Sequence, residues 1–253
     1  MNKYSQTVCI TLLTCLICAS SASAQQQAPQ IGAVEIFGCN FKDGKKMDNL
    51  NTVARHWNQW ADQNKINDYT AMTLVPIYHS AEVTTNVLWL GAWPNGPAMG
   101  EGLNLWLTKG QNLLQEFDGI MKCDVAMMFA SMNIRPPKGA PEAGSLVGFS
   151  DCKVHEHRTV SEAITALQEW SKFLADKGLD IPAWILFPAA GAPNDAKYNF
   201  KYVIGYGPPQ NYGKLFQVYD PEKADALFGR LLDCNSDRIY LMNPVRVTQP
   251  ASQ

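Results

Sequence analysis

Three residues of the N-terminal half are candidates for proton transfer. Tyr78 and His79 lie at the end of an expected strand, residues 69–78, and histidine titrates near neutral pH. Glu35 interrupts the otherwise apolar stretch 34–37. A carboxyl group that is covered on both sides needs hydrogen-bonding partners or takes a raised pKa, which makes Glu35 a candidate general base. The alternative is that Glu35 lies near the frayed start of its strand and reaches water.

Aromatic side chains on the expected strands form a second set of candidates. Rings that converge on a cavity can stack on a planar or sugar-like ligand, and Tyr and Trp add a polar atom that needs a partner when buried. The candidates for ligand binding are Trp89, Trp93, Trp184, Tyr202 and Tyr206. Trp89 and Trp93 share parity on one strand and therefore face the same side. The alternative is that these rings are ordinary core side chains.

His155 and His157 alternate along the chain, so on an extended segment their imidazoles would point the same way. Copper or zinc could use such a pair together with a third ligand. The spacing assigns no third ligand, so an exposed polar connection is the favoured interpretation and no metal ligand is predicted. The glycine-rich segment 93–102, expected to be a loop, lacks the lysine of a phosphate-binding loop. No cofactor is predicted.

Composition excludes several classes of protein. The 253 residues are 46% apolar and 17% charged, with a formal net charge of -2. The apolar fraction excludes a disordered chain. The near-neutral balance argues against a nucleic-acid partner or a polybasic membrane-surface protein.

Residues 1–24 are typical of a secretory signal peptide. A short basic start precedes the apolar stretch 8–19, which is too short to span a bilayer, and Ala22-Ser23-Ala24 offers a small-residue cleavage site. A lipoprotein would use Cys15 or Cys18, but Thr14 and Ile17 precede them. We therefore expect an exported protein, periplasmic or extracellular, that has no membrane association after cleavage.

Four cysteines remain after the expected cleavage, namely Cys39, Cys123, Cys152 and Cys234. An even number in an exported chain suggests two disulfides, with three possible connectivities.

The sequence also repeats itself. Cys39 and Trp57 fall on Cys152 and Trp170 at an offset of 113 (152 − 39), and Cys123 falls on Cys234 at an offset of 111 (234 − 123). We infer two similar units, residues 31–134 and 145–247, joined by the Pro- and Gly-rich linker 135–144. Duplication favours one bridge within each unit, Cys39–Cys123 and Cys152–Cys234.

Within each unit the hydrophobic periodicity predicts the order β-α-β-β-α-β. The expected strands are 32–41, 69–78, 86–93 and 125–134, then 183–189, 200–206 and 238–247, and the expected helical stretches are 47–61, 103–117, 160–174 and 224–232. A capping box, Thr159 with Glu162, marks the start of the third helix.

This element order, the duplication and the Trp-x-x-Trp or Trp-x-x-Phe face of the first helix of each unit resemble the dimeric α/β-barrel (Dabb-like) superfamily in a fused, tandem form. The resemblance covers about residues 32–247. It implies an α+β fold in which two tandem ferredoxin-like units close one intramolecular dimeric α/β barrel, with helices outside. It also implies a site inside the barrel, between sheet and helices or at the barrel mouth.

The resulting hypothesis is an exported protein that binds a small ring-containing molecule in one barrel cavity. A cofactor-independent enzyme, with His79, Tyr78 or Glu35 in proton transfer, is one version of it, and whether the chain is an enzyme stays open. The alternatives are a packed, non-catalytic module that binds a protein partner, or a histidine-based metal-binding protein. The sequence does not indicate an oligomeric state.

Overall fold

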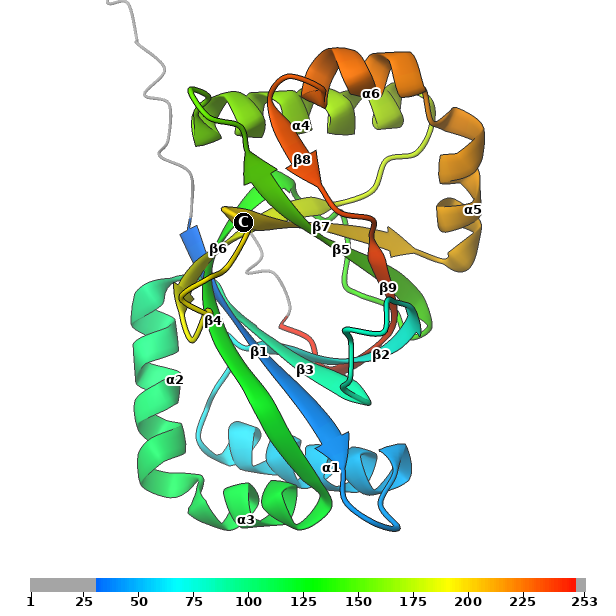
Figure 1. The fold of residues 1–253 in the computed structure, drawn as a ribbon. Coiled ribbons are helices and arrows are strands. Elements are labelled where there is room, and N and C mark those ends of the chain that lie inside the picture. Colours follow the sequence, from blue (N-terminus) through cyan, green and yellow to red (C-terminus); the bar gives the residue numbers. More distant parts are fainter. Residues whose placement is uncertain (1–30, 249–253) are drawn as a thin grey trace, which may run out of the picture.

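Apolar and β-branched segments form one closed antiparallel sheet in the computed structural model, which describes residues 31–248 (Figure 1). The strands are β1 (Ile31–Phe41), β2 (Thr70–Tyr78), β3 (Val87–Trp93), β4 (Met121–Arg135), β5 (Ser145–Val154), β6 (Ala183–Ala190), β7 (Phe200–Gly207), β8 (Leu232–Cys234) and β9 (Arg238–Arg246). Their order is β7-β6-β4-β1-β3-β2-β9-β5-β8, and a further pairing of β7 with β5 closes the sheet into a barrel. The predicted α+β barrel is therefore confirmed.

Helices cover the outside of this barrel in two groups, on opposite sides in Figure 1. The first group is α1 (Met47–Gln63), α2 (Gly96–Lys109) and α3 (Gln111–Ile120), and the second is α4 (Val160–Asp176), α5 (Pro209–Val218) and α6 (Pro221–Phe228). Both halves run strand, helix, two strands, two helices, and then one strand in the first half and two in the second. The duplication of the sequence itself stays a prediction.

Helix α2 corrects the expectation of a loop over residues 93–102. It begins at Gly96, because the side chain of Asn95 accepts a hydrogen bond from the Ala98 backbone N–H at 2.9 Å and Pro97 fits the first turn. The single helix expected over 103–117 is also wrong, since Gly110 separates α2 from α3. Helix α5 was not expected at all.

Helix α4 bears out its predicted start. Thr159 accepts a hydrogen bond from the Glu162 backbone N–H at 3.2 Å, and the Glu162 carboxylate accepts one from the Thr159 backbone N–H at 2.8 Å. Such reciprocal capping satisfies two donors that a helix start leaves unpaired.

The inside of the barrel is filled by aliphatic and aromatic side chains. Alternate residues of every strand except β8 face inward, and the buried set is Val34, Ile36, Leu74, Leu90, Phe129, Val147, Phe149, Leu186, Val203, Tyr240 and Met242. The intervening residues face the helices, where separate core clusters form under α1–α3 and under α4–α6. The layers between sheet and helices are therefore the parts of the molecule in which a cavity can lie.

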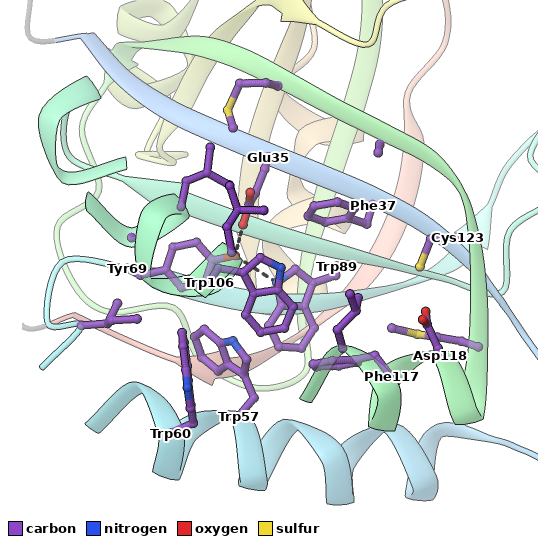
Figure 2. A pocket seen from close by; sticks show the side chains of 18 of the residues that line it. Glu35, Phe37, Trp57, Trp60, Tyr69, Trp89, Trp106, Phe117, Asp118 and Cys123 are labelled. Atoms are coloured by element: carbon purple, nitrogen blue, oxygen red, sulfur yellow. Dashed lines mark hydrogen bonds between the residues drawn. The ribbon is translucent and has the colours of Figure 1, made fainter. Parts of the chain in front are cut away.

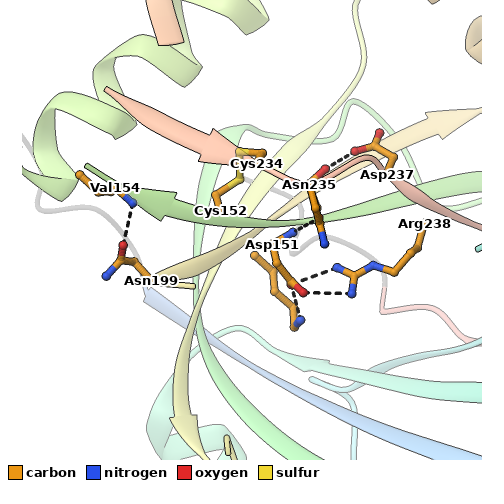
Figure 3. Close-up of a disulfide and its surroundings, with 10 residues drawn as sticks. Asp151, Cys152, Val154, Asn199, Cys234, Asn235, Asp237 and Arg238 are labelled. Atoms are coloured by element: carbon orange, nitrogen blue, oxygen red, sulfur yellow. Dashed lines mark hydrogen bonds and ion pairs between the residues drawn. A yellow bond between two sulfur atoms is a disulfide. The ribbon is translucent and has the colours of Figure 1, made fainter. Parts of the chain in front are cut away.

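Both predicted disulfides are present. Cys39 bonds to Cys123 and Cys152 bonds to Cys234, each joining the first strand of a half to a strand that returns beside it. Figure 3 shows the second bridge beside Asp151, whose carboxylate pairs with Arg238 at 3.0 Å and with Lys201 at 2.5 Å. The bridge and this ion cluster lie at the same end of β5.

Within residues 31–248, no helix combines the length and the apolar character that crossing a bilayer requires. The predicted signal peptide, with Cys15 and Cys18, lies outside the described residues.

We predict that removing one bridge destabilises the folded chain through the unfolded state. The cysteines of the first bridge are 84 residues apart, so the chain-entropy model gives a loss of at most about 4.5 kcal/mol for the Cys39→Ala, Cys123→Ala double variant. Urea unfolding of this variant and of the Cys152→Ala, Cys234→Ala variant measures the effect. Peptide mapping without reductant that linked Cys39 to Cys152 or to Cys234 would contradict the assigned pairing.

Candidate functional site

A cavity with a volume of about 810 Å³ lies between the N-terminal part of the sheet and helices α1–α3. Five of the seven tryptophans line it, namely Trp57, Trp60, Trp89, Trp93 and Trp106. Figure 2 shows Trp57 and Trp60 rising from α1, opposite Glu35 and Phe37 on β1. Leu103 and Leu107 of α2 also line the cavity and are exposed, so its opening lies along this helix.

Strand parity places these side chains in the cavity. On β3, Trp89 and Trp93 face the helices, while Leu88, Leu90 and Ala92 belong to the barrel interior. On β1, Glu35 lines the cavity, whereas the residues on either side of it are buried inside the barrel. The cavity therefore has a floor of alternate strand residues and a roof of helix side chains.

Glu35 is not at a frayed strand start. It pairs with Gly91 of β3 on one side and with Met128 of β4 on the other. Its Oε1 accepts a hydrogen bond of 2.5 Å from the Tyr69 hydroxyl, and that hydroxyl in turn accepts one of 3.0 Å from Trp89 Nε1 (Figure 2). Among the described residues, none donates a hydrogen bond to Glu35 Oε2.

This environment shifts two pKa values upward. Burial raises the pKa of Glu35 above its ordinary value of 4.5, and the hydrogen bond from Tyr69 partly offsets the rise. The pKa of Tyr69 lies well above 10, because the ring is buried and Glu35 lies beside its hydroxyl. Tyr69 is therefore a permanent hydrogen-bond donor here, while Glu35 can hold or release a proton.

Gly91 makes this contact possible. A Cβ atom built on Gly91 would lie 1.8 Å from the Tyr69 hydroxyl oxygen. Only a glycine at this register position, directly across from Glu35, leaves room for the hydroxyl. Gly102 of α2 serves Trp93 in the same way, since a Cβ there would lie 1.9 Å from the indole ring.

Charged side chains gather at the other end of the cavity, where Lys42, Asp118 and Lys122 line it. Lys42 Nζ donates to the backbone carbonyl of Asp118, and Lys122 Nζ pairs with Asp124 at 2.6 Å. Lys42 is seven residues beyond Glu35 in the chain, which places it roughly 20 Å away along β1. The deep end of the cavity thus holds one carboxyl group, and the lysines lie at the far end.

The ring candidates expected from the sequence are divided among three places. Trp89 and Trp93 line the large cavity. Trp184 packs against the barrel interior. Tyr202 and Tyr206 line a smaller cavity, of about 320 Å³, in the C-terminal half. The expectation of one shared cavity inside the barrel is therefore corrected, because the barrel is packed and the two helix layers lie on opposite sides of it.

The structure does not bring Tyr78 and His79 to Glu35. Tyr78 is 61% exposed and stacks on Tyr212 of α5, and the His79 ring nitrogen Nδ1 lies 3.0 Å from the carbonyl oxygen of Ser80. Neither residue lines either cavity.

The segment with the two histidines is a turn and not an extended strand. His157 has a φ of 65°, and the Arg158 backbone N–H donates to the His155 carbonyl at 3.1 Å. His155 Nε2 lies 2.9 Å from Asp233. Within residues 31–248, no group of three His, Cys, Asp or Glu side chains is placed to hold a metal ion.

The sequence placed Tyr69 among the aromatic residues of the expected strands without assigning it a role, and it gave no indication that Gly91, Trp57, Trp60 and Trp106 belong to the site. The sequence contains two relevant signals. Tyr69 shares parity with Thr73 on one expected strand, and a glycine lies between Trp89 and Trp93. The contact between Tyr69 and Gly91 could not be predicted, because it depends on the strand register that places Gly91 opposite Glu35.

No known family model and no curated protein matches the sequence. Solved structures do match the fold. A candidate chlorite dismutase aligns over 85% of this chain and 96% of its own, with a TM-score of 0.53 and 10% identity. A heme-binding protein from Thermus thermophilus covers 85% and 91%, with a TM-score of 0.52 and 9% identity. A mutant chlorite dismutase from Candidatus Nitrospira defluvii covers 86% and 93%, with a TM-score of 0.51 and 8% identity.

Such low identity shows the fold alone. The fold is that of the dimeric α/β-barrel proteins. The chemistry has to be argued from this chain's own residues.

A heme group does not fit the residues of the large cavity. Heme iron is commonly held by histidine or by a cysteine thiolate. No histidine lines either cavity, and the lining cysteines, Cys123 and Cys234, are in disulfides. The Tyr69 hydroxyl is already engaged by Glu35 and Trp89. We therefore derive no step through heme.

We predict that Gly91→Ala destabilises the protein by about 1–3 kcal/mol, because the added methyl group displaces the Tyr69 ring. The matched control is Gly100→Ala on α2, where no atom lies within 4 Å of the new Cβ and a helical alanine is favoured. Urea unfolding gives both free energies. Equal stability of the two variants would show that Tyr69 does not occupy this position.

The pKa of Glu35 predicts a pH-dependent stability. Between 4.5 and its raised pKa, the folded state binds more protons at Glu35 than the unfolded state, so the free energy of unfolding falls as pH rises through this window. Glu35→Gln removes the titration. The stability of this variant relative to the wild type should therefore grow between about pH 4 and pH 8, as measured by urea unfolding. A difference that stays constant over this range would contradict a buried carboxyl group.

Proposed function

We propose that the protein is an exported binder of small, ring-containing molecules, held between the N-terminal part of the sheet and helices α1–α3. The observation that carries the proposal is the cavity of about 810 Å³, lined by five tryptophans with one carboxyl group at its deep end. Ligand sites in proteins are typically concave, mostly apolar and furnished with a few fixed polar groups. A void beside Trp89, Trp93 and Glu35 favours a binder over a solidly packed interaction module.

Export is supported by two features. Residues 1–24 have the pattern of a signal peptide, and two disulfides are compatible with an oxidising compartment. A periplasmic or extracellular location follows from this proposal.

Catalysis is a second version of the same function, and it would rest on Glu35. Oε1 is held by Tyr69, so Oε2 is the atom available to take a proton from a bound molecule. The raised pKa brings the carboxyl group closer to the range in which a general base is effective. Tyr78 and His79, which the sequence suggested for this role, lie outside the cavity and would require a different site.

The binding proposal is tested with N-phenyl-1-naphthylamine, an uncharged two-ring compound whose fluorescence rises in an apolar site. The mature chain, residues 25–253, should bind it saturably. Trp106→Ala removes a ring that packs on Trp60 and Phe117, and should weaken binding by about tenfold.

The matched control for this experiment is Phe216→Ala. Phe216 is 72% exposed on α5 and lines neither cavity, so the variant should bind as the wild type does. Absence of saturable binding, or equal binding by Trp106→Ala, would rule out this cavity as the site. If a turnover substrate emerges, loss of rate in His79→Ala would return that histidine to the mechanism.

A further inference from the structure

Within residues 31–248, no cationic side chain pairs with Glu35. Four charged residues line the large cavity, namely Glu35, Lys42, Asp118 and Lys122, and the last three lie at its far end. Both lysines there already contact oxygen atoms, of Asp118 and Asp124. At the deep end, the group that donates a hydrogen bond to Glu35 is the neutral hydroxyl of Tyr69. An ionised Glu35 would therefore be a partly buried negative charge that no cation within residues 31–248 compensates.

Asp237, which lines the smaller cavity of the C-terminal half, is a carboxylate that the chain satisfies with its own donors. Asp237 accepts a hydrogen bond of 2.5 Å from Tyr206 on Oδ2 and another from Ser150 on Oδ1. Both of its oxygens are thus engaged. Glu35 differs, since among the described residues only Oε1 has a donor and Oε2 is left for a bound molecule.

Aromatic rings surround this carboxyl group closely. Tyr69 lies 4.5 Å from Trp93 and 5.3 Å from Trp57 between ring centroids, and Trp57 lies 5.4 Å from Trp89. Indole and phenol faces carry negative electrostatic potential and attract cations, most strongly for Trp and in sites shielded from water. A carboxylate within a cluster of tryptophans therefore favours a positively charged ligand.

We propose that the ligand of this cavity is a ring-containing cation, such as an aromatic ammonium or a heteroaromatic cation, whose positive charge lies against Glu35 and the tryptophan rings. The inference rests on the proposed function and names the ligand class of the same site. A cation supplies the missing partner of a buried carboxylate, whereas a neutral molecule leaves that charge unpaired or forces Glu35 to keep its proton. An anion would lie against a carboxylate of the same charge and be repelled by it.

Proton release should accompany binding. A cation stabilises the ionised form of Glu35, so the affinity for a permanent cation should increase as pH rises through the titration of this group. Tyr69, which immediately precedes β2, donates a hydrogen bond to Glu35, and Gly91 of β3 and Met128 of β4 pair with Glu35 in the sheet. Trp89 and Trp93 of β3, Trp57 of α1 and Trp106 of α2 line the same cavity. Of these groups only Tyr69 can titrate, above the relevant range. The affinity for an uncharged ligand should not rise in this way.

The experiment compares three probes of one shape: 1-methylquinolinium as the cation, 1-methylnaphthalene as its uncharged isostere, and 1-naphthoate as the anion. Each displaces N-phenyl-1-naphthylamine from the mature chain at about pH 8 and about pH 5, at fixed ionic strength. The cation should bind at least about tenfold more tightly than the isostere at the higher pH, with the anion weakest, and its advantage should shrink at the lower pH.

Two variants locate the effect. Glu35→Gln keeps an oxygen for Tyr69 but removes the charge, so the preference for the cation should fall to about twofold or less. Glu101→Gln removes an exposed carboxylate of α2 that does not line the cavity, and should keep the wild-type preference.

Equal binding of cation and isostere, or a cation preference that persists in Glu35→Gln, would overturn the inference while leaving the proposed binding function in place. Failure of all ring compounds to bind, including N-phenyl-1-naphthylamine, would overturn both.

Discussion

The pairing of β5 with β7 closes the sheet, and this closure gives the strands two covered faces. Side chains of one parity fill the barrel, and those of the other parity meet helices. A closed barrel of this size is filled by its own residues. Space for a ligand is consequently found outside the barrel wall, in the layer beneath α1–α3, where large rings meet at an angle and do not fill the volume between them.

Glu35 is the exception to the apolar character of that layer, and its neighbours are arranged around it. Gly91 leaves the space, Tyr69 enters it, and Trp89 fixes the hydroxyl of Tyr69 from the other side. Burying a carboxyl group beside only one donor destabilises the folded state. Donors to both oxygens would make this destabilisation smaller. The comparison with Asp237, whose two oxygens are both satisfied, indicates that the open oxygen of Glu35 is a property of the N-terminal cavity and not of the fold.

Much of the fold could be predicted from the sequence, because hydrophobic periodicity and the spacing of cysteines are local signals. The strand containing Glu35, the helix start at Thr159 and both disulfide pairings were expected and are present. The start of α2 was missed because its glycines suggested a loop, although Asn95 and Pro97 form a normal helix start.

The site was harder to predict. Parity shows that Trp89 and Trp93 face one side, but not whether that side is the barrel interior or a helix layer. Trp184, which parity alone could not distinguish from them, faces the barrel. Tyr202 and Tyr206 lie in the other helix layer. Tyr78 is the last residue of β2 and His79 follows it, and neither lines a cavity. These differences arise from register and closure, which join residues far apart in the chain.

The binding site that we propose for a ring-containing molecule lies between the sheet and helices α1–α3, and not inside the barrel. A crystal of the mature protein soaked with 1-bromonaphthalene tests it directly, since anomalous scattering locates the bromine. We expect a bromine peak among Trp57, Trp89 and Trp106, near Glu35. A peak inside the barrel beside Trp184, or in the cavity beneath α4–α6 alone, would contradict it.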